Sequence, residues 1–367
     1  MVPVTELTGA LDDARKRTLA LVADFDDAVL ERVWTPILSP LAWDLGHIAA
    51  YEDLWINHRH GGLDLLRSDL AELYDAFETP RCARGDIEFL RGRELFAHLD
   101  EVRERAVGVL DQRGLRDGVT VEMVARHELQ HQETMRQTLF LAGLPGGWPP
   151  AGARRFSRPA AGDWIDVPSG TFSMGAPAEG FAFDNERPRH VVEVPAFRIA
   201  RTPVTNASWL TFAEGGGYER REWWSNEGWA WKEEYDITHP QGWDGAPVDP
   251  ELPVLHVSWF EADAFARSQG ARLPTEAEWE RAATRDQETP SGIGQAWEWT
   301  ASEFAGYPGF EAHPYKEYSE VFFGVGYRVL RGGSWATHPR VGSRTFRNWD
   351  LPQRRQIFGG VRLARDP

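Results

Sequence analysis

Cysteine is almost absent from this chain, because Cys82 is the single thiol among its 367 residues. One cysteine excludes an internal disulfide, so the fold depends on buried apolar surface. The chain also lacks a run of about twenty apolar residues, which a helix needs in order to cross a bilayer. Its first residues, Met1 to Glu6, contain neither the basic nor the apolar segment of a secretory leader. We therefore expect a cytoplasmic protein without a membrane segment.

Basic residues are also fewer than acidic ones. The chain carries 40 Lys and Arg against 56 Asp and Glu, which gives a formal net charge of −16. Such a charge opposes binding to the phosphates of nucleic acids and to anionic lipid surfaces. We therefore expect small molecules as binding partners, with no nucleic acid and no membrane, and the sequence indicates no obligatory protein partner.

Apolar and aromatic side chains are abundant: 42% of the residues are hydrophobic and 17 are tryptophan. This composition indicates large buried cores, and the length allows two domains. Apolar residues recur at helical spacing through residues 1–143, which predicts a four-helix bundle with long connections. Its helices are expected at residues 5–24, 94–112 and 119–142, with a short turn at 27–33 and a helix that Ser39-Pro40 opens and that contains His47.

The composition changes after this bundle. Residues 144–162 are rich in Pro, Gly, Ala and Ser, which predicts a linker. In residues 163–367, short apolar runs alternate with turn residues, and long helices are expected at 259–269 and 275–284 alone. Short strands are expected at residues 164–167, 171–174, 190–194, 197–199 and 327–331. The predicted fold class is α+β and multidomain, with a second domain that has little regular secondary structure.

Two histidines near the end of the bundle have the spacing of metal ligands. His127 and His131 are four residues apart, so they lie on one helical face, one turn apart. With Glu128 they also spell H-E-x-x-H, the zinc metalloprotease motif in which the glutamate is the general base. The residues that follow lack the glycine and third histidine of a metzincin, and the Pro/Gly-rich segment after Leu144 lacks the downstream helix of a gluzincin. The protease interpretation therefore has no third ligand.

His47 offers a third ligand from a second helix, where it lies on the apolar stripe. Alone, a histidine in such a position is typical of a buried core residue. Beside His127 and His131 it completes a facial three-nitrogen site with open positions opposite. Imidazoles suit iron, zinc, copper and nickel, so the ligand set does not identify the metal.

Seven phrases in the second domain carry a family resemblance. They are Pro168–Gly175, Asn185–Pro188, Pro203–Asn206, Arg272–Glu280, Trp297–Thr300, Arg331–Trp335 and Gly360–Leu363. Residues 163–367 thereby resemble the formylglycine-generating-enzyme-like (sulfatase-modifying factor) fold, which is related to C-type lectins, and residues 1–143 resemble a DinB-type bundle. The combination resembles the hercynine oxygenases, the non-haem iron(II) sulfoxide synthases of ergothioneine biosynthesis.

The resemblance implies a cofactor and a reaction. His47, His127 and His131 are expected to hold Fe(II), with O2 as a co-substrate beside hercynine (trimethylated histidine) and γ-glutamylcysteine. Three neutral imidazoles leave the charge of a divalent metal uncompensated, so a thiol bound there is readily deprotonated. The expected product is hercynyl-γ-glutamylcysteine sulfoxide.

The resemblance also implies roles for two tyrosines. Tyr315 and Tyr318 match a Tyr-x-x-Tyr pattern whose first position is the family's catalytic tyrosine, a proton donor to reduced oxygen. A phenol suits that role because it is a weak acid. Tyr318 is expected beside the substrates. Without the resemblance, two tyrosines three residues apart are typical of side chains that pack on one face.

The remaining expected substrate-binding residues are Arg81, Arg84, Gln130, Asn348, Trp349 and Asp350. The two arginines suit the two carboxylates of γ-glutamylcysteine, and Asp350 is expected at its amino end. The face of Trp349 suits the quaternary ammonium of hercynine, which cannot donate hydrogen bonds. Asn348 and Gln130 match family positions near the substrates. Without the resemblance, the arginines are typical of solvated charges, and Asn348 and Trp349 of a turn residue and a core aromatic.

Other interpretations use the same residues. A selenoneine synthase-type relative would share the scaffold, but a neutral selenosugar gives Arg81 and Arg84 no carboxylate. A variant that uses free cysteine, or a zinc-dependent DinB thiol transferase, would need fewer of these groups. Formylglycine generation needs a cysteine pair in the second domain, and no cysteine follows Cys82. One departure from the family is the short segment 285–294 where a long loop is usual; we expect the core to tolerate its loss.

Overall fold

The computed structural model describes residues 4–156, 163–244 and 248–367. It divides the chain into two compact units, Met1–Trp148 and Pro149–Pro367, here called the helical unit and the second unit. Residues 157–162 of the predicted linker lie outside the described residues. Within the described ranges, no helix is both long enough and apolar enough to span a bilayer.

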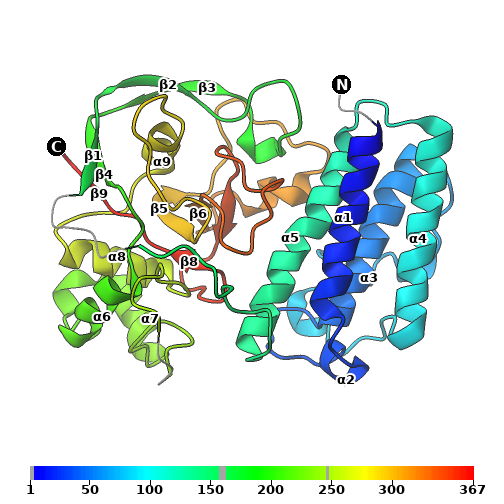
Figure 1. Ribbon diagram of the computed structural model, residues 1–367, viewed down its shortest axis with the longest axis horizontal. Helices are drawn as coiled ribbons and strands as arrows, with labels where there is room; N and C mark the ends of the chain where they lie inside the picture. The colour runs from blue at the N-terminus through cyan, green and yellow to red at the C-terminus, as the bar shows by residue number, and fades with distance from the viewer. Residues whose placement is uncertain (1–3, 157–162, 245–247) are drawn as a thin grey trace. The chain divides into compact units, whose positions relative to one another are not determined.

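The helical unit is a bundle of four long helices whose axes run side by side (Figure 1). They are α1 Val4–Val22, α3 Leu41–Glu52, α4 Gly92–Arg113 and α5 Val119–Leu141. The short helix α2 Asp27–Leu30 follows α1, and the long connection between α3 and α4 contains the 3-10 turns η2 Ser68–Leu70 and η3 Arg81–Ala83. The predicted bundle is confirmed. A feature that the apolar pattern did not predict is η1 Asp53–His60, a π-helical continuation of α3.

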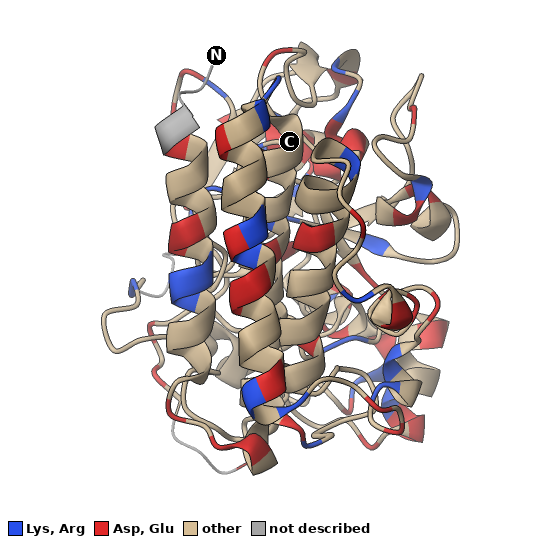
Figure 2. Cartoon of the chain, turned by 90° about the vertical axis from the view of Figure 1, so that its right-hand side faces the viewer, with Lys and Arg blue, Asp and Glu red and all other residues tan. Residues whose placement is uncertain are grey.

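Apolar residues at helical spacing build the core of this bundle. Trp43 and Leu45 of α3, Leu99 of α4, and Met135 and Leu139 of α5 belong to one buried cluster. Helix α5 packs against both α1 and α3, and α3 packs against α4. Because each helix turns one apolar stripe inward, the outer faces carry the charge. Acidic and basic residues are interspersed along these helices in Figure 2.

A buried group of charges joins all four long helices; we call it the four-helix ion cluster. It consists of Arg15 from α1, Glu52 from α3, Arg103 from α4 and Glu128 from α5. Arg15 binds Glu52 at 2.9 Å and Glu128 at 3.0 Å, and Arg103 binds Glu52 at 2.5 Å and Glu128 at 3.4 Å. Each carboxylate therefore meets two guanidinium groups, which offsets the cost of removing these charges from water.

The second unit contains three small sheets among its described residues. Their strand orders are β1-β4-β9, β2-β3 and β7-β6-β5-β8. The strands are β1 Trp164–Val167, β2 Gly170–Met174, β3 His190–Val194, β4 Phe197–Ala200, β5 Trp297–Glu303, β6 Arg328–Arg331, β7 Asn348–Asp350, β8 Gly359–Gly360 and β9 Ala364–Arg365. All pairs are antiparallel except β5 with β8.

The helices of this unit only partly match the prediction. Helices α8 Trp259–Ser268 and α9 Glu276–Ala283 lie where the sequence predicted them. Helices α6 Asn206–Glu214 and α7 Asn226–Glu234 were not predicted, so the expectation of only two helices was wrong. Both are nine residues long, which is too short for a clear apolar period. Each is stabilised at its start by a hydroxyl cap that accepts a hydrogen bond from a backbone N–H group.

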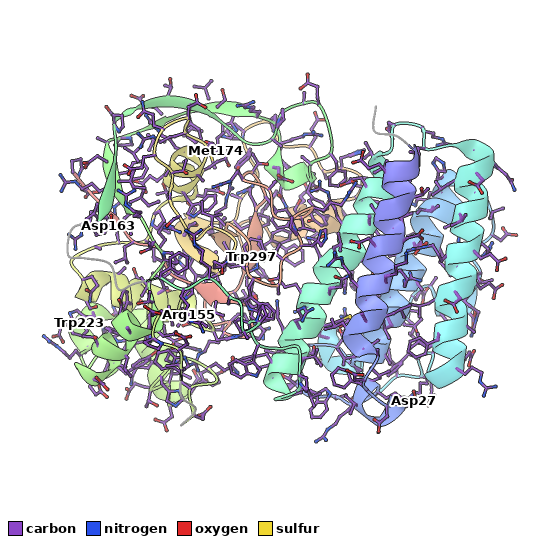
Figure 3. The ribbon with its side chains drawn as sticks, viewed as in Figure 1. Asp27, Arg155, Asp163, Met174, Trp223 and Trp297 are labelled. Atoms are coloured by element: carbon purple, nitrogen blue, oxygen red, sulfur yellow. The ribbon has the colours of Figure 1, made fainter. Side chains whose placement is uncertain are left out.

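Buried arginine–carboxylate pairs join the elements of the second unit, and they come from the phrases that carried the family resemblance. Arg362 binds both oxygens of Glu298 at 2.7 Å, and the indole N–H of Trp279 donates to the same carboxylate at 2.6 Å. Arg331 binds Glu280 at 2.5 Å. A bidentate pair fixes direction as well as distance, so these pairs hold elements that are far apart in the sequence in a defined arrangement. Trp297, the neighbour of Glu298, is labelled in Figure 3 and is buried.

Candidate functional site

Three histidines of the helical unit meet in space. His47 comes from α3, and His127 and His131 come from α5. One ring nitrogen of each lies within 4.8 Å of the other two. The ring centroids are 4.9 Å apart for His47 and His127, 4.6 Å for His47 and His131, and 4.5 Å for His127 and His131. The structure thus brings the predicted ligands into one triangle.

Backbone packing orients His47 within the triangle. Its Nδ1 lies 2.6 Å from the carbonyl oxygen of Tyr74, to which it donates, so Nε2 is left for a ligand. Gly46 makes this approach possible, because a Cβ there would lie 2.2 Å from Cζ of Tyr74. The Tyr74 hydroxyl in turn accepts from the backbone N–H of Leu90 at 2.9 Å, which fixes the residue that orients His47.

The spacing of the nitrogens suits a metal ion. His47 Nε2 and His127 Nε2 face each other at 3.1 Å. An imidazole nitrogen binds an ion such as zinc at about 2.0–2.1 Å, so two ligands at 90–110° lie roughly 2.8–3.4 Å apart. The observed distance falls in that range, and the residues therefore fit a divalent first-row metal.

Stacked rings and burial hold two of the histidines neutral and in place. Tyr51 stacks on His127 at 3.6 Å and Trp43 stacks on His47 at 5.0 Å, between ring centroids. Burial lowers the pKa of His47 and of His127 well below the usual value, and the neighbouring His131 lowers both further. Metal ligation requires neutral imidazole, so these rings are ready to bind without first losing a proton.

Glu128 is not placed to act as a general base. It is 1% exposed, and both of its oxygens face arginines of the four-helix ion cluster. Helical geometry turns it away from His127 and His131, the two residues with which it forms the H-E-x-x-H motif. The geometry therefore argues against the zinc protease interpretation.

The two predicted arginines lie on and beside η3 and differ in their surroundings. Arg81 is exposed, and its Nη1 donates to the carbonyl of Ile37 at 3.4 Å. Arg84 is 5% exposed and donates to Thr79 O at 2.9 Å, Ser39 Oγ at 2.8 Å and Ala76 O at 3.1 Å. These contacts use three of the five N–H donors of a guanidinium and hold the group rigidly.

Arg84 also contacts a ring that packs on one of the three histidines. Its guanidinium lies 3.6 Å from the centroid of the Trp43 ring, and Trp43 stacks on His47. Burial lowers the pKa of Arg84 to about 10, and the Asp44 carboxylate opposes that effect. Gln130, the remaining predicted residue of this unit, is half-buried on α5 three positions after His127, a spacing that makes the two neighbours on the helix surface.

In the second unit the structure brings Tyr315, Tyr318 and Trp349 together. Tyr315 and Tyr318 are in edge-to-face contact at 6.3 Å, and Tyr318 and Trp349 at 5.9 Å, between ring centroids. Trp349 stacks on Phe304 at 4.2 Å, and Tyr318 stacks on Phe183 at 4.5 Å. The predicted tyrosine pair and the predicted indole thus belong to one aromatic cluster.

Strand β7 carries the other two predicted residues. Arg347, directly before it, binds both oxygens of Glu276 at 2.9 Å and is fully buried, which anchors the strand. The Asn348 side chain accepts from the backbone N–H of Trp349 at 2.9 Å. Asp350 accepts from its neighbour Leu351 N at 2.8 Å and from Gln356 Nε2 at 3.0 Å.

The sequence did not predict a role for Asp184, which holds the segment that contains Tyr315 and Tyr318. Its Oδ1 accepts from Ser319 Oγ at 2.6 Å and its Oδ2 from the backbone N–H of His313 at 3.4 Å. Both ends of the segment that contains Tyr315 and Tyr318 are therefore tied to one carboxylate. Burial raises the pKa of Asp184, and the bond from Ser319 opposes that rise. The one feature of the sequence that could have indicated this role is the position of Asp184 directly before the Asn185–Pro188 phrase.

Two family descriptions match the chain. The DinB superfamily matches residues 10–135, and the sulfatase-modifying factor enzyme 1-like domain matches residues 151–292 and 291–367. The predicted fold class is thereby confirmed: a DinB-like helical domain precedes a formylglycine-generating-enzyme-like domain in an α+β chain.

Similar proteins of known activity cover the whole chain. The hercynine oxygenase of Mycolicibacterium thermoresistibile is 42% identical, and the match covers 98% of this chain and 95% of that protein. The hercynine oxygenase of Mycolicibacterium smegmatis is 41% identical over 100% of both chains. That alignment has 434 positions against 367 residues here, so the relative contains segments that this chain lacks. The formylglycine-generating enzyme of Streptomyces coelicolor is 36% identical over 32% of this chain.

Proposed function

This chain belongs to the hercynine oxygenase family, and we propose that it joins hercynine to γ-glutamylcysteine in ergothioneine biosynthesis. The reaction consumes one C–H of hercynine, the thiol and O2, and it yields the sulfoxide and one water. One oxygen atom ends on sulfur and the other leaves as water with the two hydrogens, so atoms and electrons balance. The observation that supports this proposal most is the triangle of His47, His127 and His131.

In this proposal the three histidines hold Fe(II). They fit a divalent ion by spacing and by the lowered pKa values of His47 and His127. No carboxylate belongs to the ligand set among the described residues, so the ligands themselves add no negative charge. When bound, Fe(II) supplies a Lewis acid for the thiol and electrons for O2.

The side chains of the second unit supply binding and a proton in the same proposal. Trp349 offers an aromatic face to the trimethylammonium group, with Asn348 and Tyr318 beside it. Tyr315 donates the proton that reduced oxygen requires. In the helical unit, we assign Gln130 to the substrates, and Arg81 and Arg84 to the two carboxylates of γ-glutamylcysteine. In the second unit, we assign Asp350 to the amino group of that substrate.

The test is product analysis by mass spectrometry after anaerobic reconstitution with Fe(II). Hercynine and air are combined in turn with γ-glutamylcysteine, cysteine and a selenosugar, and O2 uptake is followed with each substrate omitted. We expect sulfoxide and O2 uptake only with hercynine, γ-glutamylcysteine and Fe(II) together. Absence of uptake in fully metallated protein would overturn the proposal, and preference for another donor would reassign the substrate.

The zinc-dependent thiol transferase remains the alternative from another class, since it would use the same histidines. It predicts thiol consumption with Zn(II), in nitrogen as well as in air. Activity under nitrogen would favour it, whereas activity that needs both Fe(II) and O2 would exclude it.

A further inference from the structure

Asp44 is a buried carboxylate that the proposed chemistry leaves without a role. It lies in the first turn of α3, three residues before His47, and is 1% exposed. Within the described part of the chain, neither of its side-chain oxygens accepts a hydrogen bond. A buried charge without donors is costly, so a residue in this state needs a reason that the apolar core does not supply.

The group that Asp44 approaches is the third metal ligand. Its Oδ1 lies 3.4 Å from His131 Nδ1, a distance that allows a hydrogen bond, but the two groups are not aligned as one. A rotation of the ring that aligns the N–H group and shortens this distance by about 0.5 Å would give an ordinary N–H···O bond of about 2.9 Å. His131 Nδ1 likewise has no hydrogen-bond partner within the described ranges, so the two unsatisfied groups face each other.

The guanidinium group of Arg84 does not donate a hydrogen bond to Asp44. Arg84 feels the charge of Asp44, but the hydrogen bonds of its guanidinium go to Thr79, Ser39 and Ala76. The positive charge of Arg84 therefore stabilises the Asp44 carboxylate, but it leaves the oxygens of Asp44 without a hydrogen bond. His47 is supported differently, by the neutral carbonyl of Tyr74.

We propose that Asp44 is a positioning residue of the metal centre. With a metal ion bound, Asp44 would accept the Nδ1–H of His131, which leaves Nε2 of that ring for the ion beside the nitrogens of His47 and His127. A carboxylate behind a histidine fixes its tautomer and strengthens its second nitrogen as a ligand. The charge of Asp44 also partly offsets the charge of a divalent ion on three neutral imidazoles. This inference rests on the metal centre of the proposed function and not on its substrates.

The test compares Asp44→Asn with the wild type by Co(II) affinity. Full-length protein is stripped of metal, and Co(II) binding is measured in competition with a chromophoric chelator, together with the visible Co(II) spectrum. Asparagine keeps the size of the side chain and removes the charge. We expect affinity to fall about ten- to a hundredfold, as for other carboxylates behind metal-bound histidines, with an altered spectrum.

Asp53→Asn is the matched control. Asp53 follows α3 directly, is 3% exposed, and accepts hydrogen bonds from Asn57 at 2.8 Å, Arg105 at 3.3 Å and Leu66 N at 2.7 Å. Its partners are distinct from the three histidines. We expect Asp53→Asn to lower the melting temperature of the metal-free protein and to leave Co(II) affinity unchanged. Asp44→Asn should lower the Co(II) affinity and leave the melting temperature of the metal-free protein unchanged, because Asp44 has no hydrogen bond to lose in the absence of metal.

The outcomes separate this inference from the proposals on which it rests. Equal Co(II) affinity in Asp44→Asn and wild type, with loss of binding in His131→Ala, would overturn the role of Asp44 alone. Absence of Co(II) binding in the wild type would overturn the metal centre and the inference together. A wild type that binds metal but forms no sulfoxide would refute the proposed reaction, while weaker metal binding in Asp44→Asn would still support the inference.

Discussion

The helical unit and the second unit position their side chains by different means. In the helical unit, two helices supply all three histidines, and the helical repeat itself sets the spacing of His127 and His131. In the second unit, Tyr315 and Tyr318 come from a segment with little regular structure, and Trp349 comes from the three-residue strand β7. Each segment there has its own polar anchor: Asp184 for the tyrosines and Arg347 with Glu276 for the indole.

This difference predicts which substitutions would displace the functional side chains of each unit. A helix pair keeps ligand spacing as long as the helices pack, so polar contacts are needed only to orient rings. An irregular segment has few backbone partners, so loss of one side-chain anchor releases the residues that it carries. Substitutions should therefore act locally in the second unit, and through helix packing or metal binding in the helical unit.

The largest expected effect is loss of the metal. Replacing His47, His127 or His131 with Ala removes one of three ligands, and we expect iron binding and activity to be abolished. The second unit should remain folded, because none of these residues contributes to its core. Iron stoichiometry after reconstitution and hydrogen exchange in peptides of both units would measure this. Full iron binding by His47→Ala would show that His47 is not the third ligand.

The next effect concerns the four-helix ion cluster. Removing one partner of a buried ion pair costs about 3–5 kcal/mol, so Glu128→Ala should destabilise the helical unit by that order. Chemical denaturation of metal-free protein would measure it. Full stability in Glu128→Ala would show that the cluster contributes little, and a peptidase activity that disappears in this variant would restore the protease interpretation.

Tyr315→Phe should act on chemistry and not on folding. The ring contacts remain, but the proposed proton donor is lost, so sulfoxide formation should fall roughly a hundredfold or more. The thiol is then the nearest oxidisable group, and we expect turnover to divert to its sulfinate with hercynine intact. Tyr318→Phe is the control. Unchanged carbon–sulfur bond formation in Tyr315→Phe would make Tyr318 the next candidate.

Substitutions of Arg81 and Arg84 should distinguish an effect on thiol binding from an effect on the stability of the bundle. Loss of one charge-assisted contact costs roughly 1.5–3 kcal/mol, so Arg81→Ala should raise the KM for γ-glutamylcysteine about ten- to a hundredfold and leave that for cysteine nearly unchanged. Arg84→Ala should also lower the melting temperature, because three hydrogen bonds inside the bundle are lost. Equal losses for both thiols would remove the basis for γ-glutamylcysteine as the donor.

The last expected effect is the response to pH, which is spread over a range of pH. Burial lowers the pKa of His47 and His127 in the helical unit, and it lowers that of His256 in the second unit to about 3. The unfolded chain then takes up protons first, so stability is complete above about pH 6.5 and declines as the pH falls below it, by at most about 1.4 kcal/mol per pH unit for each histidine. Hydrogen exchange of metal-free protein between pH 7 and 5 should show the steeper decline in the helical unit. A flat response there would contradict the neutral state of the two ligands.

The sequence by itself determined the elements whose signal is local. Apolar residues three and four apart specified α1, α4 and α5, and the run from His190 to Val194 predicted its strand. The four-residue spacing of His127 and His131 was enough to identify a ligand pair, because the helical repeat fixes which side chains share a face. The phrases of the second domain indicated its fold, although the catalytic and binding roles of Tyr315, Trp349 and the arginines stay predictions.

Only the tertiary structure decided the contacts between distant residues. Arg15 and Glu128 are 113 positions apart, and Ser319 and Asp184 are 135 apart. No local pattern indicates such partners, because an isolated Asp or Arg looks the same in a sequence whether water or a buried guanidinium surrounds it. Asp44 was missed for this reason: its role depends on His131, which only the packing of α3 against α5 brings to 3.4 Å.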